Sequence, residues 1–415
     1  MRNERLAVWL HGRHIAWLSG TSLRPRLQYL PDVVAEYGAG AALLSLSLPL
    51  QSKPLIGPSV LNFFDGLLPE GQVRAHLADL NKVATTDIKA LLAVVGADCA
   101  GAVQVLAEGV DPAGSGELLP MSDAEVVAAV ESLPTWDLPA DFAITTSLGG
   151  VQSKILLSRE GGHWYWPAGG AASTHIIKPD PLDSPIPNLL AAEHWALDLA
   201  RAAGLAAART KMDRFGTREA LVVDRYDRTT DHRRIHQEDF TQVLGLASAA
   251  KYDQSTAVPS RLTQVAAAAA PHARSALSFK LDLLRAVSFN VLIGNGDAHS
   301  KNYSVLIRET GEVTLAPLYD AAPTLLLYAR SSNAGHSVAG QARLNYITLD
   351  HLVREAAGWG VDAGAARLTV TEVLTAAAEA QVPAPDELQH LPSLVADRAS
   401  DLLAGGIARR QSVPD

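Results

Sequence analysis

The chain is poor in cysteine, in long apolar runs and in positive charge. Its 415 residues include one cysteine, Cys99, which excludes an intramolecular disulfide framework and a cysteine-rich zinc site. A single thiol fits the reducing cytosol, so we expect a cytoplasmic protein. The N-terminus is charged and lacks the apolar core of a signal peptide. No apolar run approaches the roughly 18–20 residues of a membrane span, so we expect no membrane association.

The charge balance is acidic. Asp and Glu number 44 against 35 Lys and Arg, which gives a net charge of −9. This argues against nucleic-acid binding over the whole surface, although it leaves room for a local basic patch. Hydrophobic residues make up 48% and charged residues 19%, which is ordinary for a globular protein. The length indicates two to three domains, with cores large enough to need no disulfide.

Apolar periodicity divides the chain into regions. Residues 1–106 read as mixed helix and strand, with a hairpin whose turn, His11–Arg13, joins Leu6–Leu10 to Ile15–Leu18. Residues 107–140 are less regular and mark a boundary. Strands joined by glycine-rich turns are expected from 141 to 235, and mostly helices from 236 to 415.

Each region has its own expected elements. His236–Asp239 is expected to begin a helix, because its acidic residues suit a helix N-terminus. The other segments expected as helices are 70–80, 88–95, 189–203, 281–293, 349–359, 363–380 and 394–403, and those expected as strands are 102–106, 154–157, 163–166, 175–178, 220–223, 303–307 and 313–315.

The most informative stretch for chemistry is the loop Gly294–Asn302. Asp297 is followed five positions later by Asn302, which is the spacing of the protein-kinase catalytic loop. There the aspartate accepts the proton of the substrate hydroxyl and the asparagine binds Mg²⁺. Mg²⁺ needs a further hard oxygen ligand, and Asp320 stands eighteen residues after Asn302 to supply it. Asp and Asn also favour plain turns, which is the competing interpretation of this loop on its own.

Upstream segments offer the other parts of a nucleotide site. Thr145–Lys154 is a glycine-containing loop ahead of a strand, where backbone N–H groups can approach phosphates; a plain β-turn is the alternative. Lys178 ends a strand and could reach phosphates, or it is an exposed strand-end lysine. Glu193 could pair with a lysine, or it is a solvated surface glutamate. Asp224–Arg228 follows an apolar strand, as a kinase hinge does, or it is a charged loop.

Taken in order, these segments resemble the HipA family of bacterial serine/threonine kinases, the toxin half of HipBA-type toxin–antitoxin pairs. The resemblance implies an α+β, two-lobed, protein-kinase-like fold with ATP between the lobes. It also implies three parts: 1–106 as the N-terminal subdomain, 141–235 as the nucleotide-binding part with the loop and hinge, and 236–415 as the mainly helical lobe. The segments that carry it are Phe63–Gly71, Gly96–Val103, Ser147–Lys154, His175–Pro179, Val223–Arg228, His236–Asp239, Gly294–Asn302 and Pro317–Asp320.

The resemblance further implies ATP and Mg²⁺ as cofactors, and a role for each matching residue. Asp297 is expected to be the catalytic aspartate, and Asn302 and Asp320 are expected to hold Mg²⁺. Ser147 is expected to be autophosphorylated, which ejects its loop and switches the kinase off. The residues expected at the nucleotide are Gly149, Gly150, Val151, Gln152, Ser153, Lys154 and Lys178 at the phosphates, Asp224, Arg225 and Tyr226 at the adenine, and His299, Ser300, Lys301, Asn302, Tyr319 and Asp320.

Two positions depart from the family pattern. The phosphate-side loop commonly reads Gln-Glu-Lys, but here Gln152-Ser153-Lys154 replaces the carboxylate with a second candidate phosphoacceptor. An asparagine commonly precedes the helix glutamate, but here Ala192 precedes Glu193. Neither change touches Asp297, the Mg²⁺ ligands or Lys178, so activity is still expected.

The resemblance implies partners as well. A small HipB-like helix-turn-helix antitoxin is expected, with DNA contacted only indirectly through it, in keeping with the net charge of −9. The protein substrate is expected to be an aminoacyl-tRNA synthetase, since family members phosphorylate one near its ATP site. Two other functions stay open: a pseudokinase or antitoxin-binding module, and a small-molecule phosphotransferase. The intact catalytic residues argue against the first, and the Ser147 loop and N-terminal segment against the second.

Overall fold

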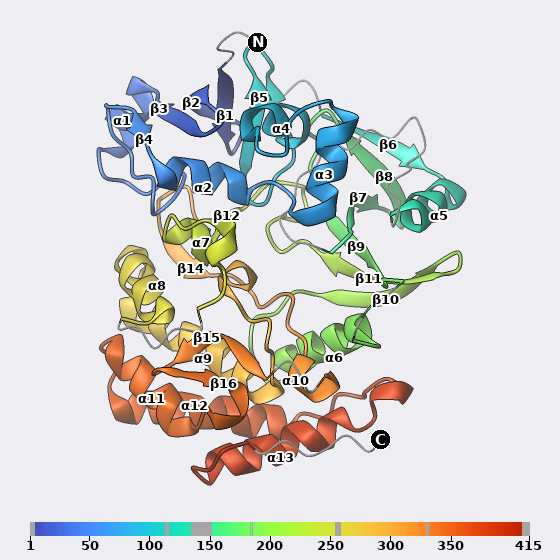
Figure 1. The fold of residues 1–415 in the computed structure, drawn as a ribbon, viewed down its shortest axis with the longest axis vertical. Helices are drawn as coiled ribbons and strands as arrows, with labels where there is room; N and C mark the ends of the chain where they lie inside the picture. Colours follow the sequence, from blue (N-terminus) through green and yellow to red (C-terminus); the bar gives the residue numbers. More distant parts are fainter. Residues whose placement is uncertain are drawn as a thin grey trace. The chain divides into compact units, whose positions relative to one another are not determined.

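The computed structural model describes residues 5–112, 116–133, 152–182, 184, 186–253, 259–328 and 332–408. Helices and sheets are mixed throughout this part, which agrees with the expected α+β class (Figure 1). The chain divides into two compact units. The first contains residues 1–183, 211–248 and 306–311, and the second contains 184–210, 249–305 and 312–415. Within the described ranges, no helix is both long and apolar enough to cross a membrane.

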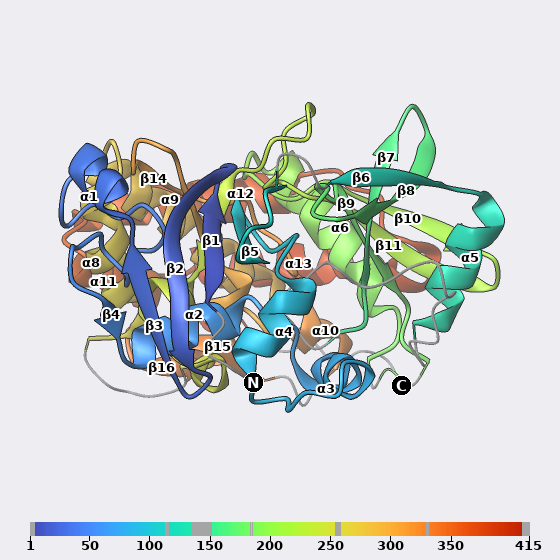
Figure 2. The ribbon, with the colours of Figure 1, turned by 90° about the horizontal axis from the view of Figure 1, so that it is seen from above.

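The first unit begins with an antiparallel sheet of strand order β4-β3-β2-β1-β5. Figure 2 shows β1, β2 and β3 side by side. The turn between β1 and β2 has positive φ at both His11 (50°) and Gly12 (74°), as a two-residue hairpin turn requires. The predicted hairpin is therefore confirmed. The strands are β1 (Leu6–Leu10), β2 (Arg13–Thr21), β3 (Arg24–Tyr29), β4 (Leu55–Ile56) and β5 (Val103–Ala107).

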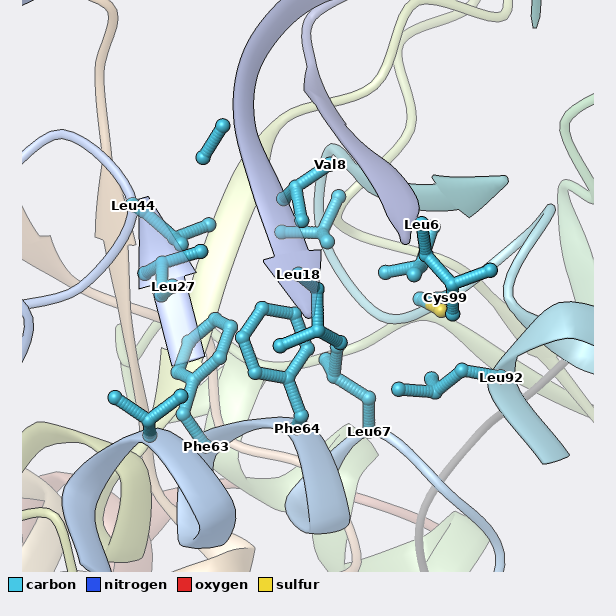
Figure 3. Packing of buried hydrophobic residues seen from close by; sticks show 14 of the residues in the cluster. Leu6, Val8, Leu18, Leu27, Leu44, Phe63, Phe64, Leu67, Leu92 and Cys99 are labelled. Atoms are coloured by element: carbon cyan, nitrogen blue, oxygen red, sulfur yellow. The ribbon is translucent and has the colours of Figure 1, made fainter. Parts of the chain in front are cut away.

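Helices cover one face of this sheet and bury its apolar residues. Figure 3 shows Phe63 and Phe64 pointing from α2 toward Leu27 and Leu18 on the strands. The two phenyl rings meet edge to face, with centroids 5.2 Å apart. Cys99 lies inside the same cluster and is fully buried, so its one thiol fills space in the core. The helices are α1 (Pro31–Tyr37), α2 (Pro58–Gly66), α3 (Gly71–Leu80) and α4 (Ile88–Val95).

A second sheet of the first unit has the order β10-β11-β9-β7-β8-β6. Its apolar face packs on α5 (Asp123–Ser132), which Ser122 and Glu125 start with a reciprocal capping box. Strand β6 is an addition to the sequence interpretation, in which residues 107–140 are less regular apart from a helix start at Met121–Glu125, which α5 confirms. The strands are β6 (Glu117–Met121), β7 (Ile155–Glu160), β8 (His163–Ala168), β9 (His175–Pro179), β10 (Thr210–Phe215) and β11 (Arg218–Asp224).

The segment at 236–239 corrects a sequence expectation. It is strand β12 (His236–Asp239) and not the first turn of a helix. His236 and Glu238 are both buried while the residues between and after them are half-buried, which is the period of a strand. The helix α7 (Phe240–Val243) starts only after Asp239, whose side chain accepts a hydrogen bond from the N–H of Gln242. The acidic residues of this segment do lie next to the start of a helix, α7, but only the last of them, Asp239, caps it.

The first unit contains a buried ionic network. The guanidinium of Arg228 lies 2.8 Å from Asp98, Arg234 also pairs with Asp98, and Arg225 lies 2.8 Å from Asp227. Burial alone would raise the pKa of Asp98, but the surrounding arginines outweigh this and hold the pKa well below its usual range. These pairs join the segment after α4 to the segment after β11, so residues far apart in sequence depend on one another.

Glu238 forms a second buried polar contact of the first unit. Its carboxyl oxygens accept a hydrogen bond from the Ser45 hydroxyl at 2.6 Å and from the N–H of Leu46 at 2.9 Å. Burial, only partly offset by these donors, raises the pKa of Glu238 to about 8. The folded protein therefore holds a proton on this carboxyl at neutral pH.

The second unit is built around α9 (Ala276–Ile293), which packs against α11, α12 and α13 (Figure 1). The predicted helices of this region and the hairpin of β13 (Ser304–Ile307) and β14 (Val313–Leu315) are confirmed. The sequence did not reveal α8 or the β15–β16 pair. The remaining elements are α6 (Leu189–Ala202), α8 (Arg261–Ala269), α10 (Thr324–Leu327), β15 (Asn333–Val338), β16 (Gln341–Arg343), α11 (Leu349–Gly358), α12 (Ala363–Glu379) and α13 (Leu391–Leu403).

Replacing Asp98 with asparagine tests the ionic network. The change leaves the buried Arg225 and Arg228 with Asp227 as their carboxylate and takes the carboxylate from Arg234, so we expect a loss of about 3–5 kcal/mol of stability. Urea unfolding followed by circular dichroism measures it. Asp231→Asn is the matched control, because Asp231 pairs with Arg233 at the surface and its loss should leave the midpoint unchanged. Equal midpoints for Asp98→Asn and wild type would contradict the role given to the network.

Replacing Glu238 with glutamine tests the buried proton. Between the ordinary pKa near 4.5 and the folded pKa of about 8, the folded state holds a proton that the unfolded state releases. The wild-type free energy of unfolding therefore loses up to about 1.4 kcal/mol per pH unit from this group as pH rises through that window. Glu238→Gln has no titrating proton at this position. The free energy of unfolding of the variant minus that of wild type should therefore increase from pH 5 to pH 8. Parallel pH profiles of the unfolding midpoints would refute this assignment.

Candidate functional site

The loop that carries Asp297 starts where α9 ends. Gly294 takes φ of +71°, and a Cβ there would lie 3.0 Å from the Cβ of Leu325, so glycine suits this position in both conformation and space. The loop is then held by α10: Leu325 donates its N–H to the Gly294 carbonyl at 2.9 Å, and Gly296 donates its N–H to the Thr324 hydroxyl at 2.8 Å. The end of a buried helix thus fixes where the loop begins.

Asn302 closes the loop on Asp297. Its side-chain Nδ2 donates a hydrogen bond to the Asp297 carbonyl at 2.8 Å. A carbonyl can only accept, so this contact identifies the amide nitrogen and leaves Oδ1 as the atom of the side chain that could coordinate a cation. The Asp297 side chain is 54% exposed. The spacing of five residues therefore produces one closed loop that presents a carboxylate and an amide oxygen.

Tyr319 brings Asp320 to the same loop. The Tyr319 hydroxyl donates to the Lys301 carbonyl at 2.8 Å and accepts from the Ser304 hydroxyl at 2.7 Å, since its own proton is already used. Asp320 follows with φ of +49°, a left-handed conformation that aspartate tolerates better than most residues. Asp320 thus sits beside the loop in a constrained backbone conformation.

His299 lies near the carboxylates of Asp297 and Asp320. It is 5% exposed, and its Nδ1 is a buried atom without a hydrogen-bond partner among the described residues. Burial lowers the pKa of His299, and the nearby carboxylates of Asp297 and Asp320 only partly oppose this shift. The imidazole is therefore neutral at pH 7. Ser300 is fully buried and donates its N–H to the Lys251 carbonyl at 2.9 Å.

A buried chain of amides supports the loop from behind, and the sequence interpretation missed it. The N–H of Asp297 donates to Asn295 Oδ1 at 3.0 Å, and Asn295 Nδ2 donates to Asn290 Oδ1 at 2.8 Å. Asn290 Nδ2 in turn contacts the Tyr303 hydroxyl at 2.9 Å. Asn290, Asn295 and Tyr303 are each at most 4% exposed. The sequence signal that could have revealed this chain of amides is the pair Asn290 and Asn295, five residues apart at the end of α9.

The first unit holds the other predicted nucleotide residues. Lys178 lies on β9, in the interior of its sheet, and is 5% exposed, so it is not an exposed strand-end lysine. Asp224 ends β11 and lies 3.3 Å from His175 Nε2. Gln152, Ser153 and Lys154, directly before β7, are each half-buried. Ser147, Gly149, Gly150 and Val151 lie outside the described residues.

The side chain of Arg225 belongs to the buried ionic network of the first unit. Its guanidinium binds Asp227 and the Ser173 hydroxyl, and its N–H donates to the Thr174 carbonyl at 2.9 Å. The Arg225 carbonyl accepts the N–H of Arg228 at 3.3 Å. The Tyr226 hydroxyl donates to Gln237.

In the second unit, Glu193 on α6 is 5% exposed, so it is not a solvated surface glutamate.

The donor set of the second unit suits Mg²⁺. Asn302 Oδ1 and the Asp320 carboxylate are hard oxygen ligands, which Mg²⁺ prefers, and it commonly takes its remaining ligands from phosphates and water. No group of three or more His, Cys, Asp or Glu side chains forms a protein-only metal site in the part of the chain that the structure describes. The residues thus fit a cation that arrives with a phosphate ligand.

Comparison with known proteins identifies relatives over most of the chain. The family model for the HipA N-terminal domain matches residues 6–106, and that for the HipA-like C-terminal domain matches residues 146–381. A candidate kinase of Sinorhizobium fredii, Y4mE, is 35% identical over 347 residues, 81% of either chain. The serine/threonine-protein kinase toxin HipA of Shewanella oneidensis is 30% identical over 289 residues, 64% of either chain.

A solved structure shares the fold. The Shewanella oneidensis complex of HipA, HipB and operator DNA contains a chain that matches this one with a TM-score of 0.77 and 24% identity over 96% of both chains. This match confirms the expected two-lobed α+β fold class.

Replacing Asn295 with alanine tests the amide chain. The change removes the acceptor of the Asp297 N–H and leaves Asn290 without its donor, so local opening of the loop should be cheaper by roughly 1–2 kcal/mol. Hydrogen-exchange mass spectrometry should then show peptides covering 294–302 exchanging about tenfold faster. Asn81→Ala, at an exposed asparagine of the first unit, should leave these peptides unchanged. Unchanged exchange in Asn295→Ala would show that the chain does not hold the loop.

Proposed function

This chain belongs to the HipA family of kinases, and we propose that it is a cytoplasmic, Mg²⁺·ATP-dependent serine/threonine protein kinase and the toxin of a type II toxin–antitoxin pair. The observation that carries the proposal is the closed loop in which Asn302 binds the Asp297 carbonyl at 2.8 Å. This contact aims an exposed carboxylate and an amide oxygen outward from one rigid turn. Phosphoryl transfer depends mostly on such positioning and on charge neutralisation.

Each residue of the loop region receives a role in transfer. Asp297 accepts the proton of the acceptor hydroxyl as its oxygen bonds to the γ-phosphorus and the bond to the bridging oxygen of ADP breaks. Asn302 and Asp320 bind the Mg²⁺, which neutralises charge on the phosphates when present. The imidazole of His299, whose pKa is lowered by burial, adds no positive charge beside the Asp297 carboxylate.

The remaining nucleotide residues are assigned by family resemblance. Lys178, which lies on β9 and is 5% exposed, is assigned to the phosphates by that resemblance. We keep the other assignments: Gly149, Gly150, Val151, Gln152, Ser153 and Lys154 at the phosphates, Asp224, Arg225 and Tyr226 at the adenine, and His299, Ser300, Lys301 and Tyr319 lining the site. The division into 1–106, 141–235 and 236–415 is part of the same proposal.

The proposed partners follow from the same relatives. The Shewanella oneidensis structure is described as a HipA, HipB and operator DNA complex. By analogy, we propose a HipB-like helix-turn-helix antitoxin for this chain, with DNA reached through that antitoxin, which suits the net charge of −9. The proposed protein substrate is an aminoacyl-tRNA synthetase. Ser147 is proposed as the autophosphorylation site, with Ser153 as a second candidate.

Intact-mass spectrometry of phosphate-free protein incubated with Mg²⁺ and ATP tests the function. Wild type should gain one phosphate that maps to Ser147. Asp297→Ala should gain it at least about a hundredfold more slowly, because the proton acceptor is lost. Nucleotide binding, measured by calorimetry, should be retained in the variant.

The alternatives predict different results. A pseudokinase would bind ATP and gain no phosphate in either protein. A small-molecule phosphotransferase would leave Ser147 unmodified and turn over ATP with an aminoglycoside or choline-like acceptor. Equal phosphorylation of wild type and Asp297→Ala would overturn the role of Asp297.

A further inference from the structure

A tyrosine outside the catalytic loop contacts the Asp297 carboxylate. The hydroxyl of Tyr252 donates a hydrogen bond to Asp297 Oδ1. His299 Nε2 lies 3.8 Å from that same oxygen. Among the described residues, these two side chains approach the Asp297 carboxylate, and both approach its Oδ1 atom. The Oδ2 atom can therefore accept a hydrogen bond from another donor.

The segment around Tyr252 is fixed by its backbone. Asp253 donates its N–H to the Gly335 carbonyl at 2.9 Å and accepts the N–H of Ser337 at 2.7 Å, so it bridges to β15. On the other side, the Lys251 carbonyl accepts the N–H of Ser300, within the catalytic loop, at 2.9 Å. Tyr252 is thus held between two backbone attachments, one of which is to the loop itself.

The ring of Tyr252 is also oriented. It meets the His299 imidazole edge to face, with centroids 4.9 Å apart and an interplanar angle of 83°. His299 is 5% exposed and cannot move far, so it defines where the phenol points. The ring contact, the backbone attachments and the hydrogen bond together fix one rotamer of an otherwise half-exposed carboxylate.

We propose that Tyr252 is a positioning residue for phosphoryl transfer: its hydroxyl holds Asp297 by Oδ1, so that Oδ2 faces the acceptor hydroxyl. The inference rests on the proposed function, in which Asp297 accepts the acceptor's proton. In an alternative role, the Tyr252 phenol would block the site by occupying the place of the acceptor hydroxyl and would have to move away before transfer. The rigid attachment of Tyr252 favours the positioning role over this alternative. Tyr252 touches neither the transferred atoms nor the nucleotide in this role.

The test compares Tyr252→Phe with Tyr346→Phe, a surface tyrosine of similar exposure (48% against 43%). The readouts are the rate of Ser147 phosphorylation by Mg²⁺·ATP, followed by intact mass, and the KM for ATP. Tyr252→Phe keeps the ring and loses one hydrogen bond to a charged group, so the maximal rate should fall about tenfold while the KM for ATP stays unchanged. Tyr346→Phe should behave as wild type.

A second readout reports the contact without activity. In protein labelled with [¹³Cζ]tyrosine, the resonance that disappears in Tyr252→Phe should shift in Asp297→Ala, and that of Tyr346 should not. A resonance that stays in place, or a Tyr252→Phe rate equal to or above wild type, would overturn the inference. An active Asp297→Ala would instead overturn the proposed function, and with it the inference.

Discussion

The geometry of the candidate site depends on how α9 ends. The helix is buried along its second half, and the guanidinium of Arg398, itself 2% exposed, donates to the carbonyls of Leu292 and Val291 at 2.8 and 2.9 Å. Both carbonyls lie in the last turn of the helix, where the Val291 carbonyl also accepts the N–H of Gly294 at 3.2 Å. An internal cation thus supplies hydrogen bonds that water would supply at a surface. Gly294 then turns the chain out of the helix, and the loop of Asp297 begins from an immobile point.

The loop is consequently rigid, although the Asp297 side chain is 54% exposed. Backbone and side-chain hydrogen bonds reach it from α10, from the amides of Asn290 and Asn295, from Tyr319 and from the segment of Tyr252. Each is modest alone, at about 1 kcal/mol. Together they leave the Asp297 carboxylate exposed on a loop that costs little to organise when a substrate arrives, which is what positional catalysis requires.

The sequence predicted local features well. The hairpin at His11–Gly12 and the helix Ile88–Val95 follow from positive-φ turn chemistry and apolar periodicity, which are properties of neighbouring residues. The Asp297–Asn302 pair was found because a fixed spacing within one loop is also local. For His236–Asp239, the acidic residues suggested a helix start, while the alternate burial that makes the segment a strand depends on partners distant in the chain.

Long-range contacts were beyond sequence reasoning. Arg225 was predicted as a hinge residue, but its side chain binds the nearby Asp227 and Asp98, which a distant segment contributes. Tyr252 belongs to no sequence motif, and its importance follows from its contact with Asp297, 45 residues along the chain. Buried polar contacts of this kind join segments separated by tens to more than a hundred residues, and only the folded chain reveals which residues are paired.

The central claim is that Asn302 and Asp320 hold the metal of a bound nucleotide. Crystals grown with Mn²⁺ and a non-hydrolysable ATP analogue test it directly, because Mn²⁺ is located by its anomalous scattering. The account predicts a peak within coordination distance of Asn302 Oδ1, an Asp320 carboxylate oxygen and the analogue's phosphates. A bound analogue whose Mn²⁺ lies away from both side chains would contradict it.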